Sequence, residues 1–148
     1  MTKYLSEEKF AETFKSTPRM AIVLFIRNVK NELLLVRRGT APHQDLWSLP
    51  GAFLLKKETL AECVNRIAIE KLGIELSKND CRVMDVVEYM DDPRGHVVQI
   101  VYKYRMIRDI LLKPWGESAE IAYFGTMPPN MAFNHKEIID KWYNNALK

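Results

Sequence analysis

Cysteine is scarce in this sequence, which limits how the fold can be held by covalent bonds or bound metal ions. The chain has 148 residues and only two cysteines, Cys63 and Cys81. Two cysteines are too few for a disulfide framework, and they lack the paired spacing of a zinc site. We therefore expect both to be buried thiols.

Long apolar runs and dense positive charge are also missing. No stretch approaches the length of a membrane span, and residues 1–8 lack the apolar core of a signal peptide. The formal net charge is +3, with basic residues scattered among acidic ones, which argues against direct nucleic-acid binding. We expect a cytoplasmic protein without a membrane or nucleic-acid partner. Small anionic ligands remain possible.

The remaining composition is that of an ordinary globular protein. Hydrophobic residues make up 47% of the chain and charged residues 28%, which is enough apolar material for a core. No repeat, linker or low-complexity tract interrupts it. The sequence therefore predicts one domain over residues 1–148.

Hydrophobic periodicity predicts an α/β fold. Residues 20–26 form a short, continuous apolar run, which is typical of a central strand buried on both faces. Turn-forming residues at 28–32 and 91–95 predict two antiparallel hairpins, and Gly73 and Asn134 suit the end of one helix and the N-cap of another. The other expected strands cover 33–38, 46–49, 83–90, 96–106 and 120–124, and the expected helices cover 6–16, 59–72 and 135–147.

The segment from residue 49 to residue 74 has the most specific spacing in the chain. It resembles the Nudix box, a loop-helix-loop motif that reads Gly, five residues, Glu, seven residues, then Arg-Glu-apolar-any-Glu-Glu-any-Gly-apolar. The positions that match in type and spacing are Glu58, Arg66, Glu70, Gly73 and Ile74. Ala52 stands where the motif has glycine, and Ile67 and Lys71 stand where it has glutamate.

The resemblance continues outside the box. Residues 34–38, 47–51, 92–95 and 131–135 are similar to the ADP-ribose pyrophosphatase branch of the Nudix family and to related ligand-sensing repressors of NAD metabolism. It implies the Nudix fold, an α/β/α sandwich around a mixed β-sheet with hairpins. It also implies an ADP-ribose-like ligand and a possible homodimer. Such repressors carry a further DNA-binding domain, so we do not expect a direct repressor.

The substitutions in the box bear on metal binding. Carboxylates hold the divalent cations that pyrophosphate hydrolysis needs, and helix positions 67, 70 and 71 share one face. Ile67, Glu70 and Lys71 change the charge of that face from minus three to zero. We expect magnesium binding, through Glu70 and Glu58, to be weak or absent. Lys71 would then take part of the cation's role, by pairing with Glu70 or contacting a ligand phosphate.

Each candidate residue also has a structural interpretation. The expected catalytic carboxylates are Glu70 and Glu120, with Glu117 as an alternative, although both loop glutamates could simply be exposed. The expected ligand contacts are Arg37, Arg38, Arg94 and Lys71. Arg37 and Arg38 point to opposite faces of a strand, so at most one enters a cleft easily. Glu58, Arg66 and Gly73 are expected to shape the box, with Arg66 pairing with Glu58, and His135 is expected to be structural.

Two functions follow from these residues. The first is a metal-dependent pyrophosphatase that acts on a nucleoside diphosphate linked to another group. The second is a binding module that keeps the nucleotide cleft but has weak or lost hydrolysis. The fold alone does not choose between them. The single glutamate where the helix face would carry three favours the binding module.

Overall fold

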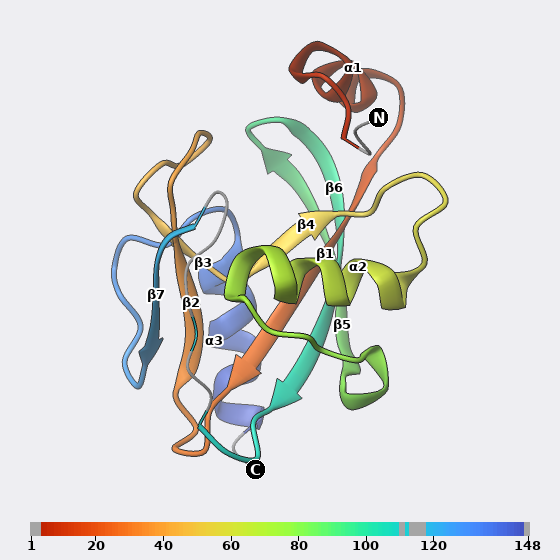
Figure 1. Ribbon diagram of the computed structural model, residues 1–148. Coiled ribbons are helices and arrows are strands. Elements are labelled where there is room, and N and C mark those ends of the chain that lie inside the picture. Colours follow the sequence, from red (N-terminus) through yellow and green to blue (C-terminus); the bar gives the residue numbers. More distant parts are fainter. Residues whose placement is uncertain (1–3, 110–111, 113–117, 147–148) are drawn as a thin grey trace.

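Helices cover both faces of a mixed β-sheet in the computed structural model (Figure 1). The structure describes residues 4–109, 112 and 118–146. Its helices are α1 (Glu7–Ser16), α2 (Leu60–Ile67), the π-helical turn η1 (Ala68–Leu72), the 3-10 turn η2 (Lys78–Asp80) and α3 (His135–Ala146). Its strands are β1 (Arg19–Arg27), β2 (Leu33–Arg38), β3 (Trp47–Ser48), β4 (Gly51–Phe53), β5 (Arg82–Asp92), β6 (Gly95–Arg105) and β7 (Ser118–Phe124). None of the helices within these residues is long and apolar enough to cross a membrane.

Strand β1 lies at the centre of the sheet, as its apolar run predicts. It pairs in parallel with β6 along its whole length and antiparallel with β2 and β4. The strand order is β3-β2-β1-β6-β5, with β4 paired to β1 and β7 paired to β2. The two expected hairpins, β1–β2 and β5–β6, are both present. The α/β fold with a mixed sheet and hairpins is therefore confirmed.

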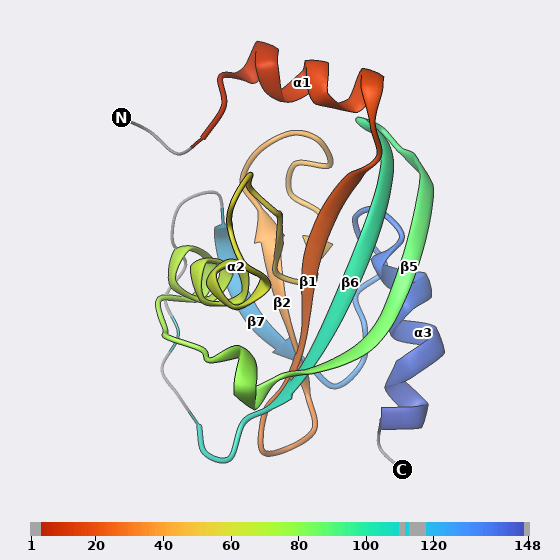
Figure 2. The same ribbon diagram turned by 90° about the vertical axis from the view of Figure 1, so that its right-hand side faces the viewer.

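The alternation of side chains along β1 builds two cores, one on each face of the sheet. Ile22, Leu24 and Ile26 pack against α2, whereas Val23 and Phe25 pack on the side of α3. Figure 2 shows α2 and α3 on opposite sides of the strands. Both cysteines are buried and free, as expected, with Cys63 and Cys81 in the α2 core.

Residue 51 begins a strand, whereas the sequence predicted that Pro50-Gly51 only ends one. Strand β4 was missed because it is three residues long and its pairing with β1 is not local in sequence. A Cβ atom at Gly51 would lie 2.8 Å from the backbone oxygen of Ile22, so only glycine allows this close approach. The glycine therefore sets how closely the box approaches the sheet.

The box helix starts and ends at the predicted residues but changes geometry in between. The Thr59 side chain caps its N-terminus in a reciprocal pair with Glu62, and Gly73 ends it in the left-handed conformation at φ 71°. After Ile67 the α-helix widens into the π-helical turn η1. Such widened turns are frequent at functional sites.

The last helix is tied to the sheet by a buried amide pair. Asn134 directly precedes α3, where we expected an N-cap. Its side-chain amide forms two hydrogen bonds with that of Gln99 on β6, at 2.8 and 2.9 Å. Both residues are buried, so this pair satisfies polar groups that would otherwise be costly to remove from water.

Candidate functional site

The loop between β4 and α2 is held by an ion pair between Glu58 and Arg66. Arg66 donates from Nε to Oε2 of Glu58 at 2.6 Å and from Nη2 to Oε1 at 2.9 Å. Nη2 also donates to the backbone oxygen of Phe53 at 2.9 Å. The two side chains are only 7% and 10% exposed. The pairing implied by the resemblance is therefore present, and it fixes the loop against the helix.

The N-terminal segment contacts the same helix through Tyr4. The Tyr4 hydroxyl contacts both carboxylate oxygens of Glu70, with 2.6 Å to Oε2. Arg66 Nη1 donates to the Tyr4 oxygen at 3.3 Å and lies 3.6 Å from Oε2 of Glu70. The Arg66 guanidinium also lies over the Tyr4 ring, 5.6 Å from its centroid. Tyr4 and Arg66 thus surround the carboxylate that the sequence singled out for metal binding.

The pKa values of this network follow from its burial and its hydrogen bonds. Burial raises the pKa of Tyr4, and its hydrogen bond to Glu70 raises it further. Burial alone would raise the pKa of Glu58, but its bonds to Arg66 and to the Leu55 amide hold it below the usual value. Burial opposes the charge on Arg66, yet the bonds to Glu58 and Tyr4 outweigh burial and raise its pKa. Glu58 and Arg66 are therefore a charged pair, and Tyr4 is a neutral donor.

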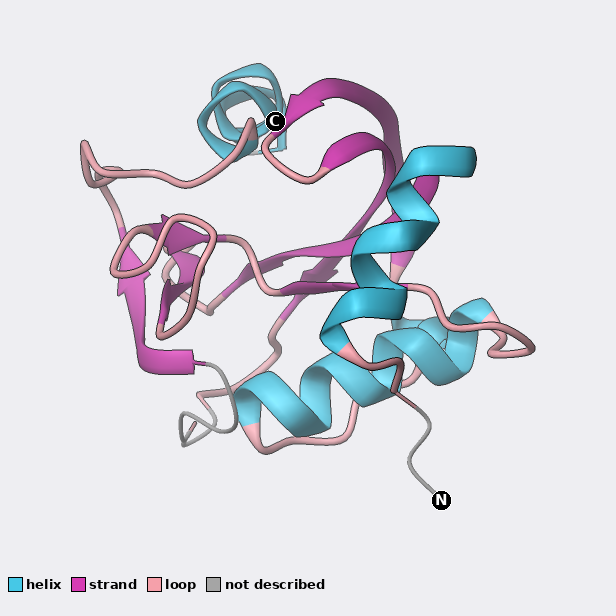
Figure 3. Ribbon diagram, turned by 90° about the horizontal axis from the view of Figure 1, so that it is seen from above, coloured by secondary structure: helices cyan, strands magenta, loops and turns pink. Residues whose placement is uncertain are grey.

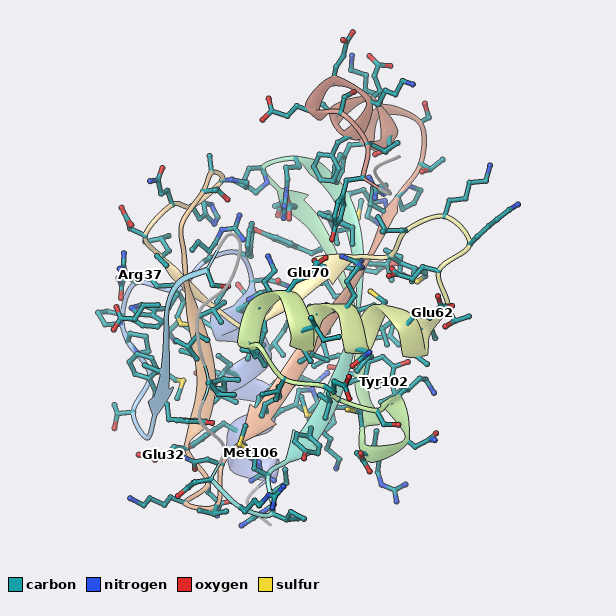
Figure 4. All side chains as sticks on the ribbon, viewed as in Figure 1. Glu32, Arg37, Glu62, Glu70, Tyr102 and Met106 are labelled. Atoms are coloured by element: carbon teal, nitrogen blue, oxygen red, sulfur yellow. The ribbon has the colours of Figure 1, made fainter. Side chains whose placement is uncertain are left out.

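An open cleft of about 560 Å³ lies along this loop and the outer side of the helix. Its lining residues are Leu55, Lys56, Lys57, Glu58, Glu62, Asn65, Arg66, Ile69 and Glu70. The two lysines offset the glutamates, so the cleft has mixed charge. Figure 4 shows Glu62 at one end of α2 and Glu70 above the helix.

The structure separates the three positions that the sequence placed on one helical face. Ile67 is fully buried in the α2 core, while the Glu70 side chain is 37% exposed. Lys71 is half-buried on the same turn as Glu70. Ile67 belongs to the α-helix, whereas Glu70 and Lys71 lie in the π-helical turn that follows it. Lys71 as a ligand contact stays a prediction.

Arg37 and Glu120 pair with each other on neighbouring strands. They lie opposite one another in the β2–β7 register, with Arg37 Nε 3.2 Å from Oε1 of Glu120. Arg37 Nη1 also lies 2.9 Å from Oδ1 of Asp45. Figure 4 shows Arg37 beside β2 and well apart from Glu70. Glu117, the alternative carboxylate, lies outside the described residues.

Arg38 and Arg94 meet at the aromatic ring of Phe133. The Arg38 guanidinium lies 4.8 Å and that of Arg94 4.7 Å from the ring centroid. Arg38 Nε donates to the backbone oxygen of Pro42 at 2.7 Å. Arg94 makes two 2.9 Å hydrogen bonds to the buried carboxylate of Asp92. The structure thus brings these two predicted ligand contacts together.

His135 lies in the interior, in agreement with the structural role expected for it. Its Nδ1 accepts a 3.0 Å hydrogen bond from the Leu49 amide. Burial, together with the nearby charges of Arg38 and Arg94, lowers the pKa of His135 to about 3. The ring is therefore neutral and acts as a hydrogen-bond acceptor.

Some neighbours of the candidate residues were not indicated by the sequence. They are Tyr4, Arg19, Phe53 and Phe133. Tyr4 and Glu70 are 66 residues apart, and no local pattern links them. The helix expected over residues 6–16 is present as α1, and it carries Phe10 and Phe14. Both rings pack against Phe53 at 5.4–5.6 Å, so α1 is held over β4 by aromatic contacts.

Comparisons with known proteins agree on one family. The NUDIX domain model matches residues 17–146. An ADP-ribose pyrophosphatase of Methanocaldococcus jannaschii is 33% identical over 122 residues, covering 77% of this chain and 69% of that protein.

Solved structures share the fold at low identity. A MutT/nudix family protein from Enterococcus faecalis has a TM-score of 0.78 and 19% identity, over 97% of this chain and 75% of that one. The NUDIX domain of Shewanella oneidensis NrtR, crystallised with ADP ribose, has a TM-score of 0.75 and 20% identity, over 97% of this chain and 100% of that one. At these identities the structures support the fold, while the family model covers most of the sequence. This chain belongs to the Nudix family.

Proposed function

We propose that this protein binds a nucleoside diphosphate-linked ligand such as ADP-ribose and that its hydrolysis of the pyrophosphate is weak or lost. The similarity to the ADP-ribose pyrophosphatase of M. jannaschii supports this class of ligand. The crystallised complex of the NrtR domain with ADP ribose supports it as well. The observation that carries the loss of hydrolysis is the engagement of Glu70 by Tyr4 and Arg66, on a helix that has Ile67 and Lys71 where the motif has glutamate.

The carboxylates of the box fit a divalent cation poorly. Magnesium needs oxygen ligands around it, with waters and substrate phosphates able to supply some of them. Both Glu58 oxygens accept hydrogen bonds from Arg66, and Oε1 also accepts one from the Leu55 amide at 3.1 Å. Glu70 faces a guanidinium and a phenol. Across residues 4–109, 112 and 118–146 no three His, Cys, Asp or Glu side chains gather as a cation site.

Removing the Tyr4 hydroxyl is expected to tighten cation binding at Glu70. Tyr4→Phe keeps the ring over Arg66 but deletes the donor to the carboxylate, a hydrogen bond of about 1 kcal/mol. We expect about a fivefold gain in Mn²⁺ affinity, measured by electron paramagnetic resonance of free Mn²⁺. Tyr143→Phe, which removes a hydroxyl donating to the Asn31 backbone oxygen, is the matched control. Equal Mn²⁺ affinity of Tyr4→Phe and the parent protein would contradict this account.

Calorimetric titration with ADP-ribose, with and without magnesium, tests the proposed function directly. We expect binding in both conditions and no magnesium-dependent release of AMP in a product analysis. Glu70→Gln should leave the affinity without magnesium within about twofold, because the proposal gives Glu70 no catalytic cation to hold. Turnover with magnesium that disappears in Glu70→Gln would overturn the proposal.

The second candidate is an active magnesium-dependent pyrophosphatase that uses Glu70, Glu58 and a carboxylate such as Glu120. The observation in its favour is the 33% identity to a protein named as an ADP-ribose pyrophosphatase. Against it, Glu120 is paired with Arg37. Magnesium-dependent AMP release is the measurement that separates the two candidates.

A further inference from the structure

Strand β5 forms one edge of the sheet, because β6 is its only neighbour among the strands that the structure describes. β5 is eleven residues long, whereas β3, at the other end of the strand order, has two residues. Figures 2 and 3 show β5 on the outer side of the curved β5–β6 hairpin. The outward backbone groups of an edge strand are a template for pairing with another strand. β5 therefore offers a long edge to a partner.

Three large apolar side chains on β5 are more than half exposed. They are Val83 (55%), Val86 (60%) and Met90 (62%). Val86 lies opposite Ile100 of β6, which packs against the α2 core, so Val86 extends the apolar face of the sheet beyond that core. A partner that covered these side chains would remove apolar surface from water, which favours association.

The exposed charges of β5 have opposite signs toward its two ends. Arg82 begins the strand, and Glu88 and Asp91 lie in its second half. All three are exposed, and none of them forms an ion pair within the part of the chain that the structure describes. Asp85, by contrast, is paired with Lys141 of α3 at 2.9 Å. The unmatched charge of the strand is therefore positive at its start and negative toward its end.

Antiparallel pairing of β5 with a second copy of itself matches these ends. The regular middle of the strand, between its two register shifts, is centred on Val87. Pairing about Val87 brings Val83 of each copy near Met90 of the other, and Arg82 near Asp91. A two-fold axis forms each of these contacts twice. In-register parallel pairing would instead place like charges side by side, so the charges favour the antiparallel direction.

The middle of the strand also suits a second copy. Pairing about Val87 puts Val86 of each copy opposite Glu88 of the other, so no two like charges face each other there. The Val86 amide donates to Oδ1 of Asp85 at 2.9 Å and would exchange that acceptor for a carbonyl group of the second copy. Asp85 keeps the contact of its Oδ2 atom with Lys141. Self-pairing therefore leaves the Asp85 carboxylate partnered.

We propose that two copies of this chain associate through β5, antiparallel and about a two-fold axis at Val87, so that the sheet continues from one copy into the other. The partner is a second copy because the apolar residues and the opposite charges that β5 needs lie on β5 itself. This inference does not depend on the ligand proposed above.

Charge exchange between the two ends of β5 tests this pairing. Arg82→Glu puts a glutamate near Asp91 of the second copy, and Asp91→Arg puts an arginine near Arg82. The double variant Arg82→Glu/Asp91→Arg restores opposite charges with their positions exchanged. Arg108→Glu makes the same charge change as Arg82→Glu at an exposed residue outside β5 and is the control. Sedimentation equilibrium of the full chain, over a range of protein concentrations, measures the dissociation constant of the dimer.

We expect the parent protein to form a dimer and each single variant to raise the dissociation constant about tenfold, because the two-fold axis changes two contacts at once. The double variant should return to within about threefold of the parent. Arg108→Glu should have the dissociation constant of the parent. Recovery in the double variant also shows that the single variants are not simply misfolded.

Three results would overturn the proposal. A parent protein that stays monomeric even at millimolar concentration has no such interface. Single variants with the dissociation constant of the parent show that the two copies meet elsewhere. A double variant as weak as the single variants shows that Arg82 and Asp91 do not lie near one another across the interface.

Discussion

Replacing Ile67 with glutamate is expected to lower the free energy of unfolding by roughly 4 kcal/mol. Ile67 is fully buried among apolar side chains of α2 and the sheet. The substitution removes a well-packed side chain and places a carboxyl group in a cluster made mostly of apolar side chains. Urea denaturation, followed by circular dichroism, measures the change.

Ile69→Glu is the matched control for this prediction. Ile69 is two residues further along the same helix, beside the cleft, and is 44% exposed. The same chemical change there should alter the free energy of unfolding by less than about 1 kcal/mol. Similar stabilities for the two variants would show that the helix is oriented differently from the structure described above.

This prediction affects how the lost glutamates of the box could be restored. A carboxylate at position 67 would add negative charge but lower the free energy of unfolding, because the side chain enters the core. Lys71→Glu is the milder change, since Lys71 is half-buried rather than enclosed. A variant series for regaining cation binding should therefore begin with Lys71→Glu, alone and combined with Tyr4→Phe.

Stability should fall steeply as the pH drops from about 6.5 to about 4.5, because of His135. The ordinary pKa of histidine is 6.5, and burial with the charges of Arg38 and Arg94 lowers that of His135 to about 3. Below pH 6.5 the unfolded chain therefore binds a proton that the folded protein does not. The free energy of unfolding falls by up to about 1.4 kcal/mol per pH unit, or by about 2 kcal/mol over the two units, because half of the unfolded chains already carry the proton at pH 6.5.

The variant His135→Asn isolates this contribution. Asparagine can accept the Leu49 amide hydrogen bond through its side-chain oxygen but does not titrate in this range. We expect its free energy of unfolding to be lower than that of the parent protein at pH 7.5. Between pH 6.5 and 4.5 the slope of this free energy against pH should correspond to the uptake of about one proton fewer on unfolding. Below pH 4.5 the protein also loses stability through Glu58 and Asp92, whose pKa values are lowered in the folded protein. The slopes of the two proteins are therefore compared only above pH 4.5. An unchanged slope would contradict the burial of a neutral ring.

Local patterns in the sequence were sufficient for much of the fold. The apolar run at 20–26 predicted the central strand, helix periodicity and Gly73 predicted the box helix, and the resemblance to the Nudix box implied the Glu58–Arg66 pair. These predictions succeed because helix periodicity, strand burial and the seven-residue spacing between Glu58 and Arg66 are all properties of residues that are close in sequence.

The remaining features depend on contacts between distant segments. The Tyr4–Glu70 contact joins residues 66 apart in sequence, and the π-helical turn after Ile67 has no recognisable signature in the residues themselves. The contacts of Arg94 with Phe53 and Phe133 join separate segments that share no spacing rule. The sequence could indicate Arg38 and Arg94 one at a time, but their common contact with the Phe133 ring requires the folded protein.

The position of Tyr4 has a practical consequence for handling the protein. An affinity tag fused in front of residue 4 would place bulky, often histidine-rich residues beside the very carboxylate whose cation affinity is to be measured. Such a tag could displace the phenol or chelate Mn²⁺ itself, and either effect would imitate a gain of metal binding. Preparations for titration should therefore have the tag cleaved, with the cleaved and uncleaved forms compared.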